Sequence, residues 1–386
     1  MAIIGLGKID KKLIPILVGA IFSILTRLLI KFEDTTLFKH KIIPNLISVF
    51  SYTFALFPYI ILIIRSKNVH YHKNENIRVD SKELIYNDNY IKQIRGKFGY
   101  ILLNSVLYFI QGILLLYSIK IKSNSWIWEI LFTTLFYYLF FKIMLYKHHY
   151  ISIALTIILG FIIDLVFENL QNDISNNLLP LCLRFLREII KSLHDVIDKY
   201  LMEKKYCSVY EISLFTGLFN LILFTILSIF NYYYLKIDDF EEFINNFNKT
   251  EFLVIIGFGI VQLGLCLSFL FTNRENTPCH IFIIAVLGQF ANLVDFSTYS
   301  IVIIVFLIFL LFLSLIFTEI IEINVCKLSY NTKRNIAKRA EIENLFVEKD
   351  TTVSSINSTD ENDDKNLSDT NGRSSLESHN NNDLLE

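Results

Sequence analysis

The amino-acid sequence predicts an all-α polytopic membrane protein of about ten transmembrane helices, built as two inverted five-helix repeats and followed by a disordered C-terminal tail. Composition is the first observation behind this prediction. Hydrophobic residues make up 53% of the 386 residues and the mean hydropathy is positive, which is atypical of a soluble globular domain. The second observation is that the apolar residues gather in segments close to the about 20 residues that cross the hydrocarbon core of a bilayer.

Ten apolar segments follow one another along the chain, and five plus five suits a duplicated, inverted-repeat architecture. The first segment follows Lys8, Lys11 and Lys12 without a small-residue cleavage site, so we expect it to remain as an anchor. The ninth is the shortest. The predicted spans are Leu13–Ile30, Leu46–Ile64, Tyr100–Ile119, Trp126–Leu145, Tyr150–Val166, Leu178–Met202, Val209–Phe230, Phe252–Phe271, His280–Leu293 and Tyr299–Phe317.

The sixth segment, Leu178–Met202, differs from the others because it is amphipathic. At 100° per residue its charged residues fall within an arc of about 140°, and apolar side chains cover the rest of the circumference. A charge at the bilayer centre costs about 2.5–3.5 kcal/mol, so we expect this charged stripe to face an internal polar cavity, as in a transporter. Near the cytosolic end, Asp198 and Lys199 are expected at the interface. The charged stripe consists of Arg184, Arg187, Glu188, Lys191, His194, Asp195, Asp198 and Lys199.

The distribution of basic residues favours a sixth segment that spans the membrane. With a cytosolic N-terminus and ten spans, the inner connections hold 22 Lys and Arg residues and the outer connections hold 7. If the sixth segment lay flat on the outer surface, the later spans would flip and the counts would become 15 inside and 17 outside. The bias therefore predicts cytosolic termini, and an interfacial amphipathic helix is the alternative for this segment.

The connections and termini divide the chain into a series of parts. The last of these is rich in Ser, Asn, Asp and Glu and cannot bury enough apolar surface to offset the entropy of ordering, so we expect it to be disordered. The parts are a cytosolic N-terminus (1–12), a first five-helix repeat (13–166) with a polar inner loop (65–99), a second five-helix repeat (178–320), a basic juxtamembrane segment (321–346) and an acidic tail (347–386).

The sequence lacks the motifs of catalysis, metal binding and nucleic-acid binding. It contains no HExxH, GxSxG or Walker loop, so we expect neither enzyme activity nor a cofactor. The five cysteines are scattered without CxxC spacing, and His148 and His149 lie in a basic connection, so we expect no metal site. The net charge of −1 indicates no nucleic-acid partner.

The cationic side chains of the charged stripe form the predicted substrate site. Arg184, Arg187 and Lys191 could hold a phosphate or a carboxylate in a dry cavity, because arginine binds such groups bidentately. Glu188 lies one turn from Arg184, and Asp195 lies one turn from Lys191. A structural ladder of ion pairs is therefore the alternative interpretation of the same residues.

Three further residues complete the predicted substrate site, and one asparagine is a predicted modification site. His194 is a candidate proton carrier, with a hydrogen-bonded structural histidine as the alternative. Gln111 and Gln262 are candidates to hydrogen-bond a sugar or a base, although intramembrane amides also bridge helices. Asn248 begins an Asn-Lys-Thr sequon in an outer connection, so we expect it to be available for glycosylation.

Five stretches of the chain carry a resemblance to a known family. Residues 98–150 read as two spans joined by a short loop and followed by a basic turn, and HHYISIALTIILGFIID (148–164) reads as the helix that closes a repeat. HDVIDKYLMEKKYCSVYEISLFTGLFNLIL (194–223) reads as a junction into the seventh span, and ENTPCHIFII (275–284) and FTEIIEINVCKLSYNTKRNI (317–336) read as the end of the fold. This order resembles the drug/metabolite transporter superfamily, in its nucleotide-sugar-transporter-like and EamA-like (solute carrier 35-like) branch.

The resemblance extends over roughly residues 10–340 and implies a secondary-active transporter. Its implied substrate is an organic, anionic metabolite such as a nucleotide sugar, moved by an antiporter with alternating access. The implied location is the Golgi, the ER or another endomembrane. The partners would be this solute and membrane lipid, and a homodimer is compatible with the architecture. The alternatives are a multipass membrane enzyme acting on lipid-linked substrates and a non-transporting membrane scaffold.

Overall fold

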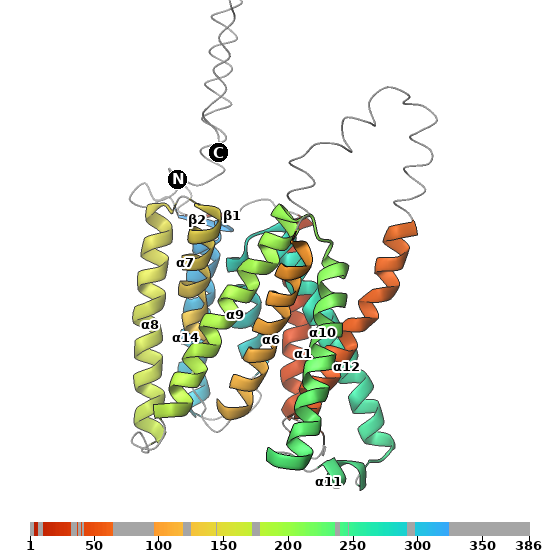
Figure 1. Ribbon diagram of the computed structural model, residues 1–386. Coiled ribbons are helices and arrows are strands. Elements are labelled where there is room, and N and C mark those ends of the chain that lie inside the picture. The colour runs from red at the N-terminus through yellow and green to blue at the C-terminus, as the bar shows by residue number, and fades with distance from the viewer. Residues whose placement is uncertain are drawn as a thin grey trace, which may run out of the picture. The chain divides into compact units, whose positions relative to one another are not determined.

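The described part of the protein is predominantly helical. A computed structural model describes residues 4–6, 11–31, 37, 40, 42–64, 96–118, 125–143, 145–171, 178–235, 240–245, 247–291 and 298–323. Over these ranges it has eleven α-helices and one two-stranded sheet (Figure 1), so the predicted all-α class is confirmed there. The predicted acidic tail (347–386), most of the polar loop (65–99) and most of the juxtamembrane segment (321–346) lie outside the described residues.

Each of the ten predicted spans coincides with a helix, and one short helix, α11, was not predicted. Short 3-10 segments extend several of them, and the second helix continues through one of these to Ile64. The α-helices are α1 (Ile14–Lys31), α2 (Ile42–Tyr52), α6 (Lys97–Ser118), α7 (Glu129–Phe141), α8 (Lys147–Gln171), α9 (Leu178–Lys204), α10 (Val209–Phe230), α11 (Phe240–Asn245), α12 (Lys249–Glu275), α13 (Ile281–Gln289) and α14 (Thr298–Phe317).

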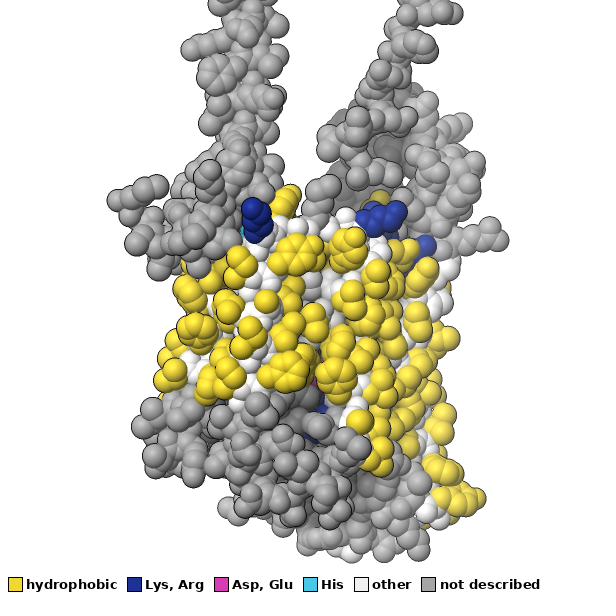
Figure 2. All heavy atoms as spheres, turned by 90° about the vertical axis from the view of Figure 1, so that its left-hand side faces the viewer, with side chains coloured by type: hydrophobic (Ala, Val, Ile, Leu, Met, Phe, Trp, Pro, Cys, Tyr) yellow, Lys and Arg dark blue, Asp and Glu magenta, His cyan; other side chains and the backbone are white. Residues whose placement is uncertain are grey.

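The apolar surface of the helices is that of a multi-helix membrane protein. Among the described residues, four helical segments are long and apolar enough to cross a membrane, and five shorter apolar helices accompany them. Figure 2 shows hydrophobic side chains spread over one face of the molecule, with Lys and Arg side chains near its upper edge. The four long segments are Ile42–Ile64, Lys97–Leu115, Val209–Tyr234 and Lys249–Glu275.

Polar contacts at one end of the helix bundle show which helix termini lie together. Lys97 Nζ lies 2.6 Å from Glu211 Oε1, which joins the start of α6 to the start of α10. Asn276, directly after α12, donates from Nδ2 to the carbonyl oxygen of Lys12 at 2.9 Å, just before α1. We call this end the basic end, because eight described basic residues lie at helix termini there. They are Lys11, Lys12, Lys97, Lys142, Lys147, Lys204, Lys205 and Arg274.

A small sheet joins the two ends of this helical body. Strand β1 (Ile4–Leu6) pairs antiparallel with strand β2 (Ile321–Ile323), with Gly5 opposite Glu322. The segment before α1 and the segment after α14 therefore lie side by side at the basic end, as Figure 1 shows.

Helix α9 runs through the bundle instead of lying across its end. It packs against α6 and α7 along its length and also contacts α10 and α12 (Figure 1). Toward the basic end, apolar side chains of α9 form one buried cluster with those of α6, α10 and α12. Here the apolar side of α9 therefore packs against protein. The members of this cluster with the least exposure are Ile101, Ile197, Leu201, Val209 and Ile212.

Local sequence signals explain where α10 and α12 begin. Ser208 and Glu211 form a reciprocal capping box, in which the Glu211 N–H donates to Ser208 Oγ at 3.1 Å and the Ser208 N–H donates to Glu211 Oε2 at 3.3 Å. Asn248 caps α12 by accepting a hydrogen bond from the Glu251 N–H at 2.9 Å. Asn248, the first residue of the predicted sequon, is exposed. Its capping atom is the side-chain oxygen Oδ1, whereas a glycan would attach to the amide nitrogen.

Gly217 allows α10 to approach α2 closely. A Cβ added there would lie 2.9 Å from Tyr52 Cβ and 3.1 Å from the Thr53 nitrogen and the Val49 carbonyl oxygen. Because backbone atoms cannot rotate away, we expect Gly217→Leu to destabilise the protein by about 1–3 kcal/mol. The measurement is the free energy of unfolding in mixed detergent micelles.

Gly257→Leu is the matched control, because a Cβ at Gly257 meets no atom within 4 Å among the described residues. We expect this variant to unfold like the wild type. Equal stability of the Gly217 and Gly257 variants would contradict the close approach of α2 and α10.

Candidate functional site

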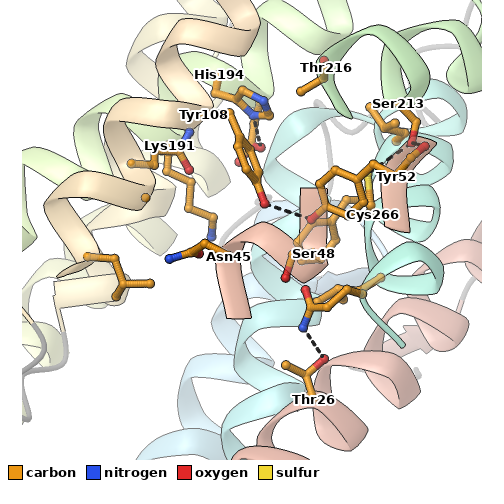
Figure 3. A pocket seen from close by; sticks show the side chains of 18 of the residues that line it. Thr26, Asn45, Ser48, Tyr52, Tyr108, Lys191, His194, Ser213, Thr216 and Cys266 are labelled. Atoms are coloured by element: carbon orange, nitrogen blue, oxygen red, sulfur yellow. Dashed lines mark hydrogen bonds and ion pairs between the residues drawn. The ribbon is translucent and has the colours of Figure 1, made fainter. Parts of the chain in front are cut away.

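A cavity of about 450 Å³ lies among helices α1, α2, α6, α9, α10 and α12. This volume is within the range of about 300–1,000 Å³ that small-molecule sites occupy. The side chains around it point inward from helices far apart in the sequence, as Figure 3 shows for Thr26, Tyr108 and Lys191. One face of α9 supplies all of its Arg, Lys and Asp lining residues and one of its two histidines, the other being His40; the residues from α9 are Arg187, Lys191, His194, Asp195 and Asp198.

The structure brings together five of the six residues predicted to bind substrate. Arg187, Lys191 and His194 line the cavity from α9, as do Gln111 from α6 and Gln262 from α12. The sixth residue, Arg184, is partly buried but is not a lining residue of this cavity. Five of the eight residues of the charged stripe therefore face an internal polar cavity, and the role of these residues in substrate binding stays a prediction.

Lys191 forms an ion pair with a residue of another helix that sequence analysis missed. Its Nζ lies 2.5 Å from Oε2 of Glu129, which is 1% exposed at the start of α7. The neighbouring Ser192 donates from Oγ to the Glu129 carbonyl oxygen at 3.1 Å. An acidic residue within a predicted span was the signal that could have identified Glu129, since an intramembrane carboxylate needs a partner.

Arg187 is also paired, with its direct neighbour in the chain. Its Nη1 donates to Oε1 of Glu188 at 3.2 Å, and Glu188 is 1% exposed. Helical spacing suggested pairs one turn apart, with Asp195 as the partner of Lys191. The observed partner of Lys191 differs from this expectation because its long side chain reaches the neighbouring helix α7.

His194 lies between two carboxylates of its own helix. Its Nδ1 is 3.5 Å from Oδ1 of Asp195 and 3.7 Å from Oδ2 of Asp198. Asn104 of α6 donates from Nδ2 to the other oxygen of Asp198 at 2.8 Å. Sequence analysis did not select Asn104, because an isolated asparagine in an apolar segment shows nothing of which helix it will face.

Two tyrosines connect α2 and α6 beside the cavity. The hydroxyl oxygens of Tyr52 and Tyr108 are 3.0 Å apart, and the Tyr108 ring centre lies 5.8 Å from that of His194 (Figure 3). Sequence analysis did not identify this pair, since 20 tyrosines are spread along the chain and their spacing distinguishes none of them.

The two predicted glutamines have different environments. Gln262 donates from Nε2 to Oγ1 of Thr26 at 3.3 Å and thereby bridges α12 and α1, which favours the helix-bridging interpretation. In contrast, the amide nitrogen of Gln111 is buried and has no hydrogen-bond partner among the described residues. Gln111 is therefore the better placed of the two to donate to a bound solute.

Lys199 and Asp198, which we expected at the interface near the cytosolic end, are buried by protein. They are 4% and 5% exposed. The Lys199 ammonium donates to the carbonyl oxygens of Asn273 at 2.8 Å and of Asn276 at 2.7 Å, at the C-terminal end of α12. The physical reason is that the end of α12 offers carbonyl groups without partners within the helix, and a buried cation satisfies them.

A second cluster of titratable side chains lies at the basic end. His148 Nε2 is 3.2 Å and His149 Nε2 is 3.9 Å from Oε1 of Glu319, so the start of α8 is tied to the residues after α14. The Tyr146 N–H donates to Nδ1 of His149 at 3.0 Å. A neutral His149 therefore carries its proton on Nε2 and faces Glu319 as a donor, which suits a hydrogen-bonded tie better than a metal ligand.

No protein-family model and no curated protein matches this chain. Function is therefore inferred from the structure itself, a multi-helix membrane protein with a polar cavity lined by one charged helix.

Proposed function

We propose that this protein is a secondary-active transporter of a polar organic solute with an anionic group, without catalytic activity. The observation that carries the proposal is the charged face of α9, which lines a cavity of about 450 Å³ within an otherwise apolar helix bundle. Burying so many charges is costly for stability alone, and intramembrane ionisable residues commonly serve solute or ion pathways. A transporter needs such a site near the middle of the membrane.

The pairing of β1 with β2 supports ten crossings of the membrane. Two segments that pair directly lie on the same side of the bilayer, so an even number of crossings separates them. If α9 lay on the membrane surface, nine apolar segments would remain and the two strands would end on opposite sides. Ten crossings divided into five and five start the two halves from opposite sides, which is the arrangement of an inverted repeat.

The described basic residues support a cytosolic location of the basic end, and with it both termini. Eight of them lie at helix termini of this end, whereas Lys31 and Lys249 lie at the opposite end. Asn248, next to Lys249, would then face the lumen of an endomembrane compartment, where its sequon is glycosylated. This arrangement belongs to the proposed membership in the drug/metabolite transporter superfamily.

The anionic character of the proposed solute rests on Arg187 and Lys191, which reach the cavity alongside the carboxylates of Asp195 and Asp198. The side chains of Arg187 and Lys191 are 30% and 19% exposed, whereas their carboxylate partners Glu188 and Glu129 are both 2% exposed. The cations thus present donors to the cavity, and the anions neutralise them from behind. A phosphate or carboxylate of the solute would bind the Arg187 guanidinium, whose buried Nε has no partner among the described residues.

The uncharged lining residues suit the rest of such a solute. Hydroxyl and amide groups around the cavity can hydrogen-bond sugar hydroxyls or a base, and the aromatic rings offer apolar surface. A nucleotide sugar combines all these features, and exchange for the free nucleotide would make the protein an antiporter. The hydroxyl and amide groups are those of Asn45, Ser48, Tyr108, Gln111, Ser213 and Thr216.

Counterflow in proteoliposomes tests the proposal. Vesicles loaded with single nucleotides or carboxylates are offered labelled nucleotide sugars and organic anions, and we expect uptake that depends on the internal anion. Arg187→Gln should weaken the apparent affinity roughly 10- to 100-fold, which corresponds to the about 1.5–3 kcal/mol of a charge-assisted hydrogen bond.

Lys204→Gln is the matched control, because Lys204 belongs to the same helix but is exposed at the basic end. We expect unchanged uptake in this variant. Absence of uptake for the whole panel, with folded protein, would refute transport of organic anions. Uptake with unaltered affinity in Arg187→Gln would refute the assigned solute site.

A further inference from the structure

His194, Asp195 and Asp198 form a compact cluster within the cavity wall, which we call the His194 cluster. One ligating atom from each of these three residues lies within 4.8 Å of the others. The carboxylate side chains are 8% and 6% exposed, and the histidine side chain is 13% exposed. All three nevertheless line the cavity, so a small ion from the cavity can reach them.

Two buried polar atoms of the His194 cluster lack partners. Asp195 Oδ2 and His194 Nε2 are fully buried without a hydrogen bond among the described residues. The Asp195 oxygen is a hydrogen-bond acceptor that becomes a donor when it binds a proton. The same holds for His194 Nε2 when the neutral ring carries its hydrogen on Nδ1. A buried carboxylate oxygen without a donor is costly, and this cost is removed when the oxygen binds a proton.

The charges around the cluster do not neutralise it. Lys191 is already paired with Glu129, and Arg187 is paired with Glu188, so these four charges cancel in pairs. Asp195 and Asp198 then face one imidazole, which carries at most one positive charge. The cluster therefore has a net charge of −1 or −2, and a further monovalent cation would bring it to or toward neutrality.

Within the described ranges, the side chains that the neighbouring helices place at the cluster are uncharged. Asn104 donates to Asp198 from α6, and Asn273 of α12 donates to the backbone carbonyl of Asp195. From α10, the lining side chains are the uncharged Ile212, Ser213 and Thr216. The titratable and charged groups around the cluster and its cavity are Lys191, Glu129, Arg187, Glu188, Tyr108, Tyr52, Cys266, Cys207, His40 and Lys199, which is paired with Glu203.

We propose that the His194 cluster is a proton-binding site that couples transport to protons. The inference rests on the proposed function and deepens it by naming the coupling ion. The proton comes from water and adds to a lone pair of Asp195 Oδ2 or of the His194 imidazole, with no other bond formed or broken. Histidine is the side chain suited to change charge between pH 5 and pH 8.

Coupling follows from electrostatics within one cavity. An anionic solute at Arg187 and Lys191 is repelled by Asp195 and Asp198 on the same helix face, and a bound proton removes part of this repulsion. The proton therefore favours solute binding, and by linkage the solute favours proton binding to the same extent. Solute and proton cross in the same direction.

The first experiment measures proton binding without any solute. Infrared difference spectra of the full-length protein in liposomes are recorded between pH 8 and pH 5, in choline chloride. We expect a carbonyl band of a protonated carboxylic acid, lost in Asp195→Asn and shifted in position in Asp195→Glu. Glu275→Gln, at an exposed carboxylate of the basic end, should leave the band unchanged.

Salt replacement in the same experiment distinguishes a proton from a metal ion as the bound cation. At constant pH, sodium chloride or zinc chloride replaces choline chloride, and we expect no change in the carboxyl or imidazole bands. A response to either salt would overturn the proton assignment in favour of a metal-ion site. Identical pH-difference spectra of the wild type, both Asp195 variants and His194→Gln would overturn it as well, and Asp195→Glu covers the case in which Asp195→Asn does not fold.

A transport experiment separates the coupling from the proposed function. Proteoliposomes are offered the same labelled nucleotide sugars and organic anions with and without an inwardly directed proton gradient. We expect the gradient to accelerate uptake by the wild type, and this acceleration to be lost in His194→Gln while counterflow persists. Counterflow that no proton gradient accelerates would refute coupling but retain the transporter, whereas absent counterflow would refute transport itself.

Discussion

Replacement of Lys191 by methionine is expected to destabilise the protein by about 3–5 kcal/mol. The change leaves the Glu129 carboxylate 1% exposed and without the ammonium group that lies 2.5 Å away. Removing one partner of a buried ion pair is this costly because the other charge stays buried without compensation. The measurement is the free energy of unfolding in mixed micelles.

The double variant Glu129→Gln with Lys191→Met distinguishes the ion pair from simple loss of packing. Because both charges are removed together, we expect it to recover most of the lost stability. Glu129→Gln alone should be destabilised, since it strands the ammonium group. If the effects of the single changes simply add in the double variant, the two residues are not energetically coupled and the ion pair does not stabilise the fold.

Replacement of Lys199 by methionine is expected to cost about 3 kcal/mol. Its ammonium group binds the carbonyl oxygens of Asn273, Arg274 and Asn276, which are the last acceptors of α12, and is itself 4% exposed. Methionine fills a similar volume but offers no donor, so buried carbonyl groups lose their hydrogen bonds. Unfolding in mixed micelles measures this loss as well.

Lys204→Met is the matched control, because Lys204 lies in the last turn of the same helix and is exposed. We expect it to change stability by less than about 0.5 kcal/mol. Equal stability of the Lys199 and Lys204 variants would show that water replaces the ammonium at the end of α12.

The helices could be predicted closely from the sequence because long apolar segments have few alternatives to a helix. Among the starts of the helices, the largest difference from the prediction is at α2, which begins at Ile42 instead of Leu46. Pro44 lies in its first turn, where proline is tolerated because no N–H is needed there. Helix α11 (Phe240–Asn245) was missed, since its six residues are far fewer than the about 20 of a membrane span.

The site could be predicted only as far as one helix allows. Helical spacing correctly placed Arg187, Lys191 and His194 on one inward face, because the 3.6-residue period acts within a helix. It could not identify Glu129, which is 62 positions from Lys191, or Asn104, which is 94 positions from Asp198. Such partners depend on which helices become neighbours, and no local pattern carries that information.

The polar links of α9 also bear on how the chain enters the membrane during synthesis. A helix with this many charges is a poor substrate for direct release into lipid. Its partners Glu129 on α7 and Asn104 on α6 precede it in the chain, so both are already made when α9 leaves the ribosome. The order of the helices thus lets α9 insert against a prepared polar surface, and Asn273 of α12 completes its environment once the later helices arrive.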